Sequence, residues 1–275
     1  MLSNRVARES SEIVNFIWNH PANRSKRFTQ LARAVNFQLR ARMFNHRVQA
    51  AVGKNGKVWV ELHRTGATKA LYANPPDWPE MVVWENYLKE GDAFYDVGAN
   101  IGVYTVFAAC LGANVTAFEP AKDTVALLYE NIELNRFTNV KVFEAAASDT
   151  KGQATFTSNL DCVNRFDPDG IEKVETVLLD DIIGSQQVSG MKIDVEGYEQ
   201  YVLQGAKVAL SEHRIGLIQI EWNDMSTLVL GEDRTPTADL LKSCGYELLR
   251  PDNNGVLIPT PNPEGTKDIF ARPKD

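Results

Sequence analysis

The stretch "FYDVGANIGVYTVFAA", residues 94–109, decides how the rest of the chain is interpreted. It begins as a short apolar run, which predicts a buried strand, and ends as a longer apolar run, which predicts a helix. Asp96 stands at the end of the strand, and Gly98, Asn100 and Gly102 form the turn. In open α/β sheets, ligands bind beyond the carboxyl ends of the strands, where such turns lie. The stretch therefore predicts a small-molecule site on an α/β sheet.

The alternation of strands and helices continues after this stretch. It favours a mostly parallel sheet that is covered by helices on both faces. The strand-rich end of the chain predicts an antiparallel edge, so the expected fold is a Rossmann-like α/β sheet with an antiparallel C-terminal edge. The expected strands are 94–97, 114–118, 140–146, 153–157, 175–179, 191–195, 217–221, 246–249, 256–258 and 269–271, and the expected helices are 103–111, 123–135, 198–210 and 237–244.

The N-terminal part of the chain has a different character. Apolar residues recur at helical spacing in 11–19 and 28–48, while 57–63 alternates like a strand. The proline-rich segment "NPPDWP" at 74–79 is a strong breaker of regular structure. Two units are therefore expected: a mainly helical extension with a short strand segment, 1–80, and a Rossmann-like domain, 81–275.

Charge is also unevenly spread along the chain. Residues 1–50 hold nine Lys/Arg against Glu9 and Glu12, a balance of +7 that leaves −14 for the rest of a chain whose net charge is −7. A basic arm can meet an anionic substrate, a membrane surface or nucleic acid. The alternative that we favour is a helical extension that packs on the acidic body or on a second copy of the chain. That alternative explains the apolar stripe of Leu31, Val35, Leu39 and Met43, which needs a partner surface.

Composition narrows the class of protein. A chain of 275 residues with 44% hydrophobic residues can bury a real core. Its three cysteines, Cys110, Cys162 and Cys244, have neither CxxC nor zinc-site spacing, which favours a reducing compartment. No apolar window reaches the length of a membrane-spanning helix, and no signal-peptide pattern is visible. We expect a cytoplasmic protein without a membrane span.

The glycine spacing points to one cofactor over another. Dinucleotide sites use G-x-G-x-x-G, whereas Gly98 and Gly102 are only four apart and follow the carboxylate of Asp96, which would repel a pyrophosphate. A carboxylate suits the cationic amino group of S-adenosylmethionine. Glu119 lies 21 residues after Gly98, about where an acidic side chain meets a ribose diol. An NAD-dependent oxidoreductase is accordingly disfavoured.

The chain also resembles a known family, the FkbM-type methyltransferases, which are class I enzymes dependent on S-adenosylmethionine. The similarity covers roughly residues 90–223 and leaves residues 1–80 without a motif. It rests on the blocks "YDVGANIGVYT" (95–105), "AFEP" (117–120), "NIELN" (131–135), "AASDTKG" (146–152), "LLDDI" (178–182), "MKIDVEGYEQYVLQGA" (191–206) and "IQIEWN" (218–223).

This resemblance implies a function and a set of cofactor-binding residues. The implied reaction is O-methylation of a hydroxyl group on a sugar, glycan or natural product, with S-adenosylhomocysteine as the product. The positions that match the family are expected to contact the methionine end, the ribose and the adenine. They are Asp96, Gly98, Ala99, Asn100, Gly102, Tyr104, Thr105, Glu119, Pro120, Ala146, Ala147, Ser148 and Asp194. Asn131 and Asn135, in contrast, are expected to fix the turn after their helix.

Acidic residues near two further strand ends are candidates for the chemistry. Methyl transfer needs a base to remove the hydroxyl proton, and the predicted catalytic residues are Asp194 and Glu221. We expect Glu196 to point to the opposite side from Asp194, to have a separate role and to cap the helix at residue 198. His213, in a predicted connection at the far rim, is expected to be a surface residue.

A divalent metal and other reaction classes remain as alternatives. Asp194, Glu221 and Asn223 offer the oxygen ligands that Mg²⁺ accepts, but no spacing forces them together, so no metal is predicted. Methylation of nitrogen or of a protein is one alternative reaction. No Asn/Asp-Pro-Pro-Tyr block is present, which counts against methylation of nucleic bases and against nucleic acid as a partner. A non-catalytic protein that retains a nucleoside pocket is another alternative. The segments expected to line the acceptor site are 159–172, 222–235 and the extension with Trp78.

Overall fold

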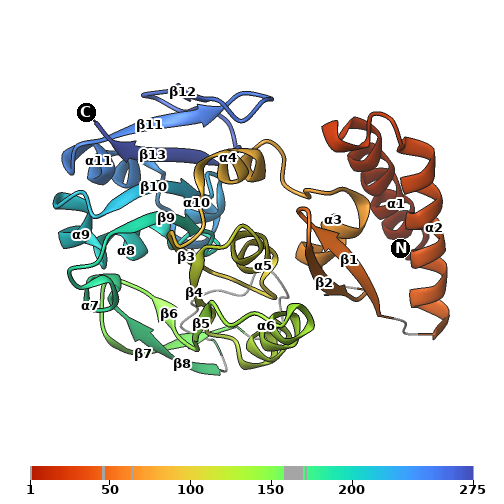
Figure 1. The fold of residues 1–275 in the computed structure, drawn as a ribbon, viewed down its shortest axis with the longest axis horizontal. Coiled ribbons are helices and arrows are strands. Elements are labelled where there is room, and N and C mark those ends of the chain that lie inside the picture. Colours follow the sequence, from red (N-terminus) through yellow and green to blue (C-terminus); the bar gives the residue numbers. More distant parts are fainter. Residues whose placement is uncertain (1, 45–46, 63–64, 158–169, 171, 275) are drawn as a thin grey trace.

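The computed structural model describes residues 2–44, 47–62, 65–157, 170 and 172–274 (Figure 1). Its centre is an eight-stranded sheet in the order β12-β11-β13-β10-β9-β3-β4-β5. The five strands from β10 to β5 are parallel, and β13 runs antiparallel to both β10 and β11. This arrangement confirms the predicted fold class. The strands are β3 (Ala93–Val97), β4 (Asn114–Phe118), β5 (Val140–Phe143), β9 (Val188–Ile193), β10 (Ile215–Ile220), β11 (Tyr246–Pro251), β12 (Leu257–Pro259) and β13 (Ile269–Pro273).

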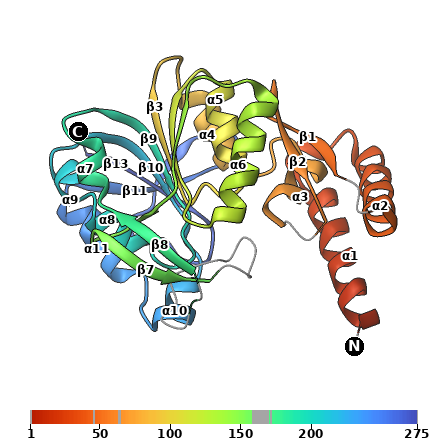
Figure 2. The same cartoon turned by 90° about the horizontal axis from the view of Figure 1, so that it is seen from below.

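Helices cover both faces of this sheet, as Figure 2 shows from below. On one face lie α4 (Glu80–Tyr87), α5 (Val103–Cys110) and α6 (Lys122–Asn135). On the other lie α7 (Leu179–Ile183), α8 (Glu199–Gln204), α9 (Lys207–Ser211) and α11 (Thr235–Ser243). Alternate residues of β3 accordingly enter different cores, with Phe94 in the first and Tyr95 and Val97 in the second. A small sheet of β6 (Ala146–Ala147), β7 (Gly152–Phe156) and β8 (Glu172–Val177) and the helix α10 (Met225–Leu230) complete this part.

The register of the central strands aligns three buried polar residues. Asp96 of β3 is the Cα partner of Lys192 in β9, and Lys192 is the partner of Gln219 in β10. All three are buried, with exposed fractions of 0%, 5% and 0%. Because register partners in a parallel sheet project to the same face, one polar row crosses the apolar sheet close to its carboxyl edge. Such a row is costly unless its members satisfy one another or a ligand.

The N-terminal unit contains more regular structure than the sequence pattern predicts. It consists of α1 (Leu2–Asn19), the short 3₁₀ helix η1 (Pro21–Asn23), α2 (Arg27–Phe44), β1 (Val48–Val52), β2 (Gly56–Val60) and α3 (Thr65–Tyr72). The helix expected at 28–48 ends at Phe44, because Val48 is already paired with Val60 in an antiparallel hairpin.

Two other expected elements are divided in the structure. The helix expected at 198–210 is split at Gly205, where an added Cβ would lie 1.9 Å from the carbonyl oxygen of Ser148, so the chain bends at this close approach. The strand expected at 140–146 is likewise divided between β5 and β6, which belong to different sheets.

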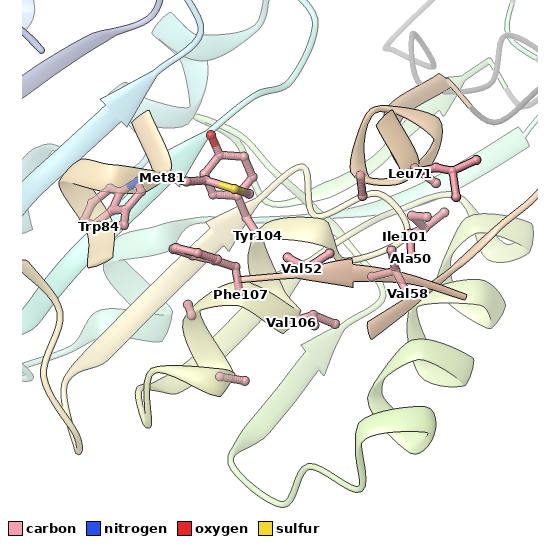
Figure 3. Close-up of a cluster of buried hydrophobic side chains, with 14 of the residues drawn as sticks. Ala50, Val52, Val58, Leu71, Met81, Trp84, Ile101, Tyr104, Val106 and Phe107 are labelled. Atoms are coloured by element: carbon pink, nitrogen blue, oxygen red, sulfur yellow. The ribbon is translucent and has the colours of Figure 1, made fainter. Parts of the chain in front are cut away.

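A shared core joins the N-terminal unit to the α5 side of the sheet. Figure 3 shows Val52 and Val58 of the β1–β2 hairpin close to Val106 and Phe107 of α5, and all four are buried in one cluster. The predicted boundary near residue 80 therefore does not separate two independent cores, and the division into units stays a prediction.

Two asparagines of α6 bind the edge of the hairpin. Asn131 accepts a hydrogen bond from the Trp59 amide at 2.7 Å, and its own amide donates to the Ile101 carbonyl at 2.8 Å. Asn135 accepts from the Lys57 amide at 2.9 Å and donates to the Lys57 carbonyl at 2.7 Å. The expectation that these residues only fix the next turn is therefore wrong. They satisfy backbone groups of β2 that its hairpin partner leaves open.

The apolar stripe of α2 is only partly covered in the single chain. Leu31 is half-buried against the core, whereas Val35, Leu39 and Met43 are 58%, 58% and 66% exposed. None of the helices in the described parts of the chain is long and apolar enough to cross a membrane.

Candidate active site

A cavity of about 240 Å³ opens beyond the carboxyl ends of β3, β4, β9 and β10. Eleven of the residues predicted for the cofactor or for catalysis line it: Asp96, Gly98, Ala99, Asn100, Tyr104, Glu119, Pro120, Ala146, Ala147, Asp194 and Glu221. Gly102, Thr105 and Ser148 are not among the lining residues. The topology thus brings strand-end residues from 96 to 221 into one place, although the role of each stays a prediction.

Asp96 is the most deeply buried carboxyl group of the cavity. It is 0% exposed, and its Oδ2 accepts a hydrogen bond from the Thr105 hydroxyl at 2.6 Å. Its Oδ1 is buried and has no hydrogen-bond partner. Burial raises the pKa of Asp96, and the Lys192 ammonium group opposes that rise. A buried, half-satisfied carboxyl group in a cavity wall is suited to a donor or cation supplied by a ligand.

The glycines of the turn are required by the protein's own packing. Gly98 has φ 79°, and a Cβ there would lie 1.9 Å from the carbonyl oxygen of Asp194. Gly102 has φ 91°, and a Cβ there would lie 2.4 Å from Leu128 of α6. From the sequence, both glycines are predicted to let a ligand approach closely. In the structure a second backbone and a helix already lie at these distances, so each glycine also serves the packing of the chain itself.

Glu119 ties the glycine turn to the end of β4. It is 7% exposed, its Oε2 accepts from the Asn100 amide at 2.9 Å, and its Oε1 accepts from the Ala121 amide at 3.0 Å. Burial raises its pKa to about 7, even though both amides favour the ionised form. Each oxygen keeps acceptor capacity toward the cavity, so Glu119 is able both to hold the turn and to accept hydrogen bonds from a ligand.

The side of the cavity predicted for adenine is mostly apolar. Ala145, Ala146 and Ala147 line it together with Phe156, which the sequence argument did not identify. Ser148 turns away, with its hydroxyl donating to Asp149 Oδ1 at 3.2 Å. Small alanine side chains leave room for a flat ring, and Phe156 offers an aromatic surface.

Lys192 is the main site residue that the sequence argument missed. Its Nζ lies 2.8 Å from Asp194 Oδ2 and 4.6 Å from the centre of the Tyr104 ring. Burial alone would lower its pKa, but Asp194 and Asp96 outweigh burial, so the pKa of Lys192 is raised and the group stays charged. Gln219 donates to the Tyr104 hydroxyl at 3.1 Å and fixes that ring. The sequence feature that could have identified Lys192 is a charged residue inside an otherwise apolar strand, because a buried lysine needs a partner.

Asp194, Glu196 and Glu221 form a carboxyl cluster in which one oxygen of each lies within 4.8 Å of the others. The expectation that Asp194 and Glu196 point to opposite sides is wrong. Residues two apart in an extended segment project to the same side, and the chain also leaves β9 at Ile193, with Glu196 at φ 56°. Sequence reasoning therefore separated two groups that the structure brings together.

The cluster divides its charge unequally. Burial and the carboxylates of Asp194 and Glu196 raise the pKa of Glu221 to about 11, so it carries a proton at neutral pH. Burial also works to raise the pKa of Asp194, but Lys192 outweighs it and holds that pKa below its ordinary value. The result is a neutral carboxylic acid beside an ionised carboxylate, with Lys192 fixed on the carboxylate.

Three other predictions have clear outcomes. Glu199, rather than Glu196, holds the loop before α8, because its Oε1 accepts from the Val195 and Gly197 amides at 3.2 and 3.1 Å. His213 lies outside the cavity lining, with Nε2 2.9 Å from the Cys244 carbonyl oxygen. Asn223 accepts from the Met225 amide at 2.8 Å, so it serves the start of α10.

The N-terminal unit contributes two residues to the cavity that were not predicted from the sequence. Lys69 of α3 and Asp77 of the following loop line it, and their Nζ and Oδ1 atoms lie 3.6 Å apart. Trp78 is half-buried, is not a lining residue, and donates from Nε1 to the Asn253 carbonyl at 3.0 Å. Of the segment expected at 159–172, nearly all lies outside the described residues.

Comparison with known proteins gives relatives that are named as methyltransferases. The chain is 30% identical to the hexuronic acid methyltransferase AglP of Haloferax volcanii, over 48% of this chain and 57% of the relative. It is 31% identical to the 31-O-demethyl-FK506 methyltransferase FkbM of Streptomyces tacrolimicus, over 44% of this chain and 62% of the relative. Less than two thirds of each relative is therefore matched.

A solved structure and a family model complete the comparison. The structure of a 16S rRNA N2 G1207 methyltransferase from T. thermophilus covers 83% of this chain and 50% of its own, with a TM-score of 0.46 and 12% identity. The model of the methyltransferase FkbM domain matches residues 96–248. Because that match spans more than half of the chain, the protein belongs to the FkbM methyltransferase domain family.

Proposed function

We propose that the protein is an S-adenosylmethionine-dependent O-methyltransferase whose acceptor is a hydroxyl group on a sugar, glycan or natural product. The observation that carries this proposal is a single cavity with two kinds of wall. One wall combines the buried Asp96 and Glu119 with small alanines, and the other combines the ionised Asp194 with the neutral Glu221. The first wall suits the adenosine and methionine parts of S-adenosylmethionine, and the second wall suits removal of a proton from a hydroxyl group.

The residues present fit the cofactor. The orphaned Oδ1 of Asp96 is matched to a cationic amino group, and Glu119 is matched to ribose hydroxyls, which donate hydrogen bonds to a carboxylate. Ala146, Ala147 and Phe156 would enclose the adenine. Bound S-adenosylmethionine would supply an activated methyl group on its sulfonium centre. The chain contributes by placing the acceptor oxygen and by accepting its proton.

Asp194 is the proposed general base. It lies at the end of β9, lines the cavity and stays ionised because Lys192 holds Oδ2 at 2.8 Å. Glu221, which is protonated, removes one of two like charges that would otherwise repel each other, and it is able to donate a hydrogen bond to Asp194 or to the acceptor. The ring face of Tyr104 adds a cation–π contact to the ammonium group of Lys192, with Nζ 4.6 Å from the ring centre.

Two relatives and the cavity support the proposed acceptor class. AglP is named for a hexuronic acid and FkbM of S. tacrolimicus for a hydroxyl of FK506, so both names describe small hydroxylated acceptors. The cavity of this chain is rich in carboxyl groups, which accept hydrogen bonds from hydroxyl donors. Together these observations favour an oxygen acceptor over a nitrogen or protein acceptor.

Calorimetry and a turnover assay test this function together. We expect S-adenosylhomocysteine to bind the full chain and NAD to show no comparable binding. Labelled methyl transfer is expected to a member of a panel that contains methyl glycosides, glycuronosides and a hydroxylated macrolide. Binding of NAD in place of S-adenosylhomocysteine would sink the cofactor assignment. Cofactor binding without turnover on any hydroxyl acceptor would favour a non-catalytic nucleoside-binding protein.

The affinity for S-adenosylhomocysteine is expected to rise with pH between about 6 and 8. Burial places the pKa of Glu119 at about 7, and only its ionised form accepts hydrogen bonds at both oxygens from ribose hydroxyls. Ionisation across this interval changes the competent fraction up to about tenfold. The same raised pKa makes Glu119 stabilise the unliganded fold below the unfolded pKa near 4.5, and this contribution is lost as the pH rises through about 7.

Two variants separate Glu119 from other buried acids. Glu119→Gln is expected to weaken binding at pH 8 by about tenfold or more and to flatten the dependence on pH. Glu80, whose pKa burial also raises to about 7, does not line the cavity, so Glu80→Gln should keep the wild-type pH profile. Calorimetry at pH 6, 7 and 8 makes the comparison. An unchanged profile in Glu119→Gln would remove Glu119 from the ribose site.

A further inference from the structure

We propose that the N-terminal unit is part of the active site, with Lys69 and Asp77 binding the hydroxyl groups of an uncharged, sugar-like acceptor. Neither residue falls within the matched family domain, which begins at residue 96. Both nevertheless line the same cavity as Asp194 and Glu221. This assignment rests on the proposed methyl transfer and adds to it the part of the chain that selects the acceptor.

Lys69 and Asp77 lie on the side of the cavity that is assigned to the acceptor. The charge of Lys69 interacts first with Asp77 and then with Asp194 and Asp268, and these carboxylates raise its pKa. The residues assigned to adenine and ribose do not contribute to this interaction. Lys69 keeps a side-chain exposure of 55% and Asp77 one of 32%, so both can reach a molecule that enters the cavity.

Contacts between the N-terminal unit and the rest of the chain fix the position of Lys69 and Asp77. Asn131 and Asn135 bind the backbone of β2, and the β1–β2 hairpin shares a core with α5. Trp78, the residue that follows Asp77, donates a hydrogen bond to the Asn253 carbonyl. α3 in turn packs on both strands of the hairpin. Lys69 and Asp77 therefore project from a fixed wall, as a specificity site requires.

Charge identifies the kind of acceptor group. Among the described lining residues the cations are Lys69 and Lys192, and each already faces a carboxylate, at 3.6 and 2.8 Å. The carboxyl groups outnumber them even though Glu221 is protonated, because Asp77, Asp96, Glu119, Asp194 and Glu196 also line the cavity. An anionic acceptor would enter an acidic field without a cation reserved for it. Neutral hydroxyls, in contrast, donate to Asp77 and accept from Lys69 at once.

Two sugars that differ only in charge provide the test. The probes are methyl α-D-glucopyranoside and methyl α-D-glucuronoside, titrated into the full chain saturated with S-adenosylhomocysteine and followed by saturation-transfer NMR. We expect the glucopyranoside to bind at least tenfold more tightly than the glucuronoside. Lys69→Met and Asp77→Asn should each weaken glucopyranoside binding about tenfold or more and leave the affinity for S-adenosylhomocysteine unchanged. Asp77→Lys should reverse the preference between the two sugars.

A matched control lies in the same unit. Lys54 is 81% exposed, pairs with Glu85 at 2.7 Å and does not line the cavity, so Lys54→Met should behave as wild type. Thermal unfolding and S-adenosylhomocysteine affinity report whether each variant is folded. The proposal is overturned if the folded Lys69 and Asp77 variants bind the glucopyranoside as wild type does, if the glucuronoside is preferred, or if neither sugar binds. Failure of the methyltransferase assignment would appear separately, as loss of S-adenosylhomocysteine binding in the wild-type chain.

Discussion

Asp194→Asn is expected to lower kcat for methyl transfer about 100- to 10,000-fold, the range over which a positioned general base contributes. Asparagine keeps the size of the side chain but cannot take the proton of the acceptor hydroxyl. The Lys192 ammonium group would also lose the carboxylate that it contacts at 2.8 Å. The affinity for S-adenosylhomocysteine should change far less than kcat, because Asp96 and Glu119 are assigned to the cofactor. Single-turnover kinetics with the acceptor found in the panel would measure the loss.

The neighbouring carboxyl groups provide graded controls. Glu221 is protonated at neutral pH, so Glu221→Gln retains a neutral donor and should lower turnover less than Asp194→Asn does. Glu196→Gln tests the third member of the cluster. Turnover should survive treatment with EDTA. A full loss of turnover that added Mg²⁺ restores would show that the cluster is a metal site. Wild-type turnover in Asp194→Asn would return Asp194 to a structural role.

The candidate cofactor site could be predicted because its parts obey a local rule. Each parallel strand delivers the residues after its last apolar position to the same edge of the sheet, so Asp96 and Asp194, though 98 residues apart, could be placed together from the sequence alone. The order of the strands within the sheet could not be deduced from this rule. β9 is inserted next to β3, and only this crossover brings Lys192 into register with Asp96.

The helix α4 also escaped prediction. Its buried residues Met81, Val83 and Trp84 do not share one helical stripe, and Trp84 packs on Phe94 of β3 and Phe270 of β13. Because the buried residues are spread around so short a helix, its sequence shows no period of 3.6 residues. The contacts of Asn131 and Asn135 with β2 span 72 and 78 residues, and neither helix nor strand pattern encodes such a pairing.

Gly98→Ala is expected to lower the free energy of unfolding by about 2 to 5 kcal/mol. At φ 79° an alanine costs about 1 to 2 kcal/mol in backbone strain. Its Cβ would lie 1.9 Å from the Asp194 carbonyl oxygen, so the turn must move away from β9, and overpacking of that kind costs about 1 to 3 kcal/mol more. Moving the turn also displaces Asn100 from Glu119, so S-adenosylhomocysteine should bind at least tenfold more weakly.

Gly231→Ala separates the two costs of that substitution. Gly231 has a similar φ of 70°, but a Cβ there would meet nothing within 4 Å, so only the backbone strain of about 1 to 2 kcal/mol is expected. Denaturant unfolding of both variants gives the difference, which reports the contact between the turn and β9. Because that contact fixes the Asp194 backbone against the glycine turn, it also sets the spacing between the proposed base and the cofactor wall. Equal losses of stability in the two variants, with cofactor affinity intact in Gly98→Ala, would show that the turn is free to move and that Gly98 serves the backbone conformation alone.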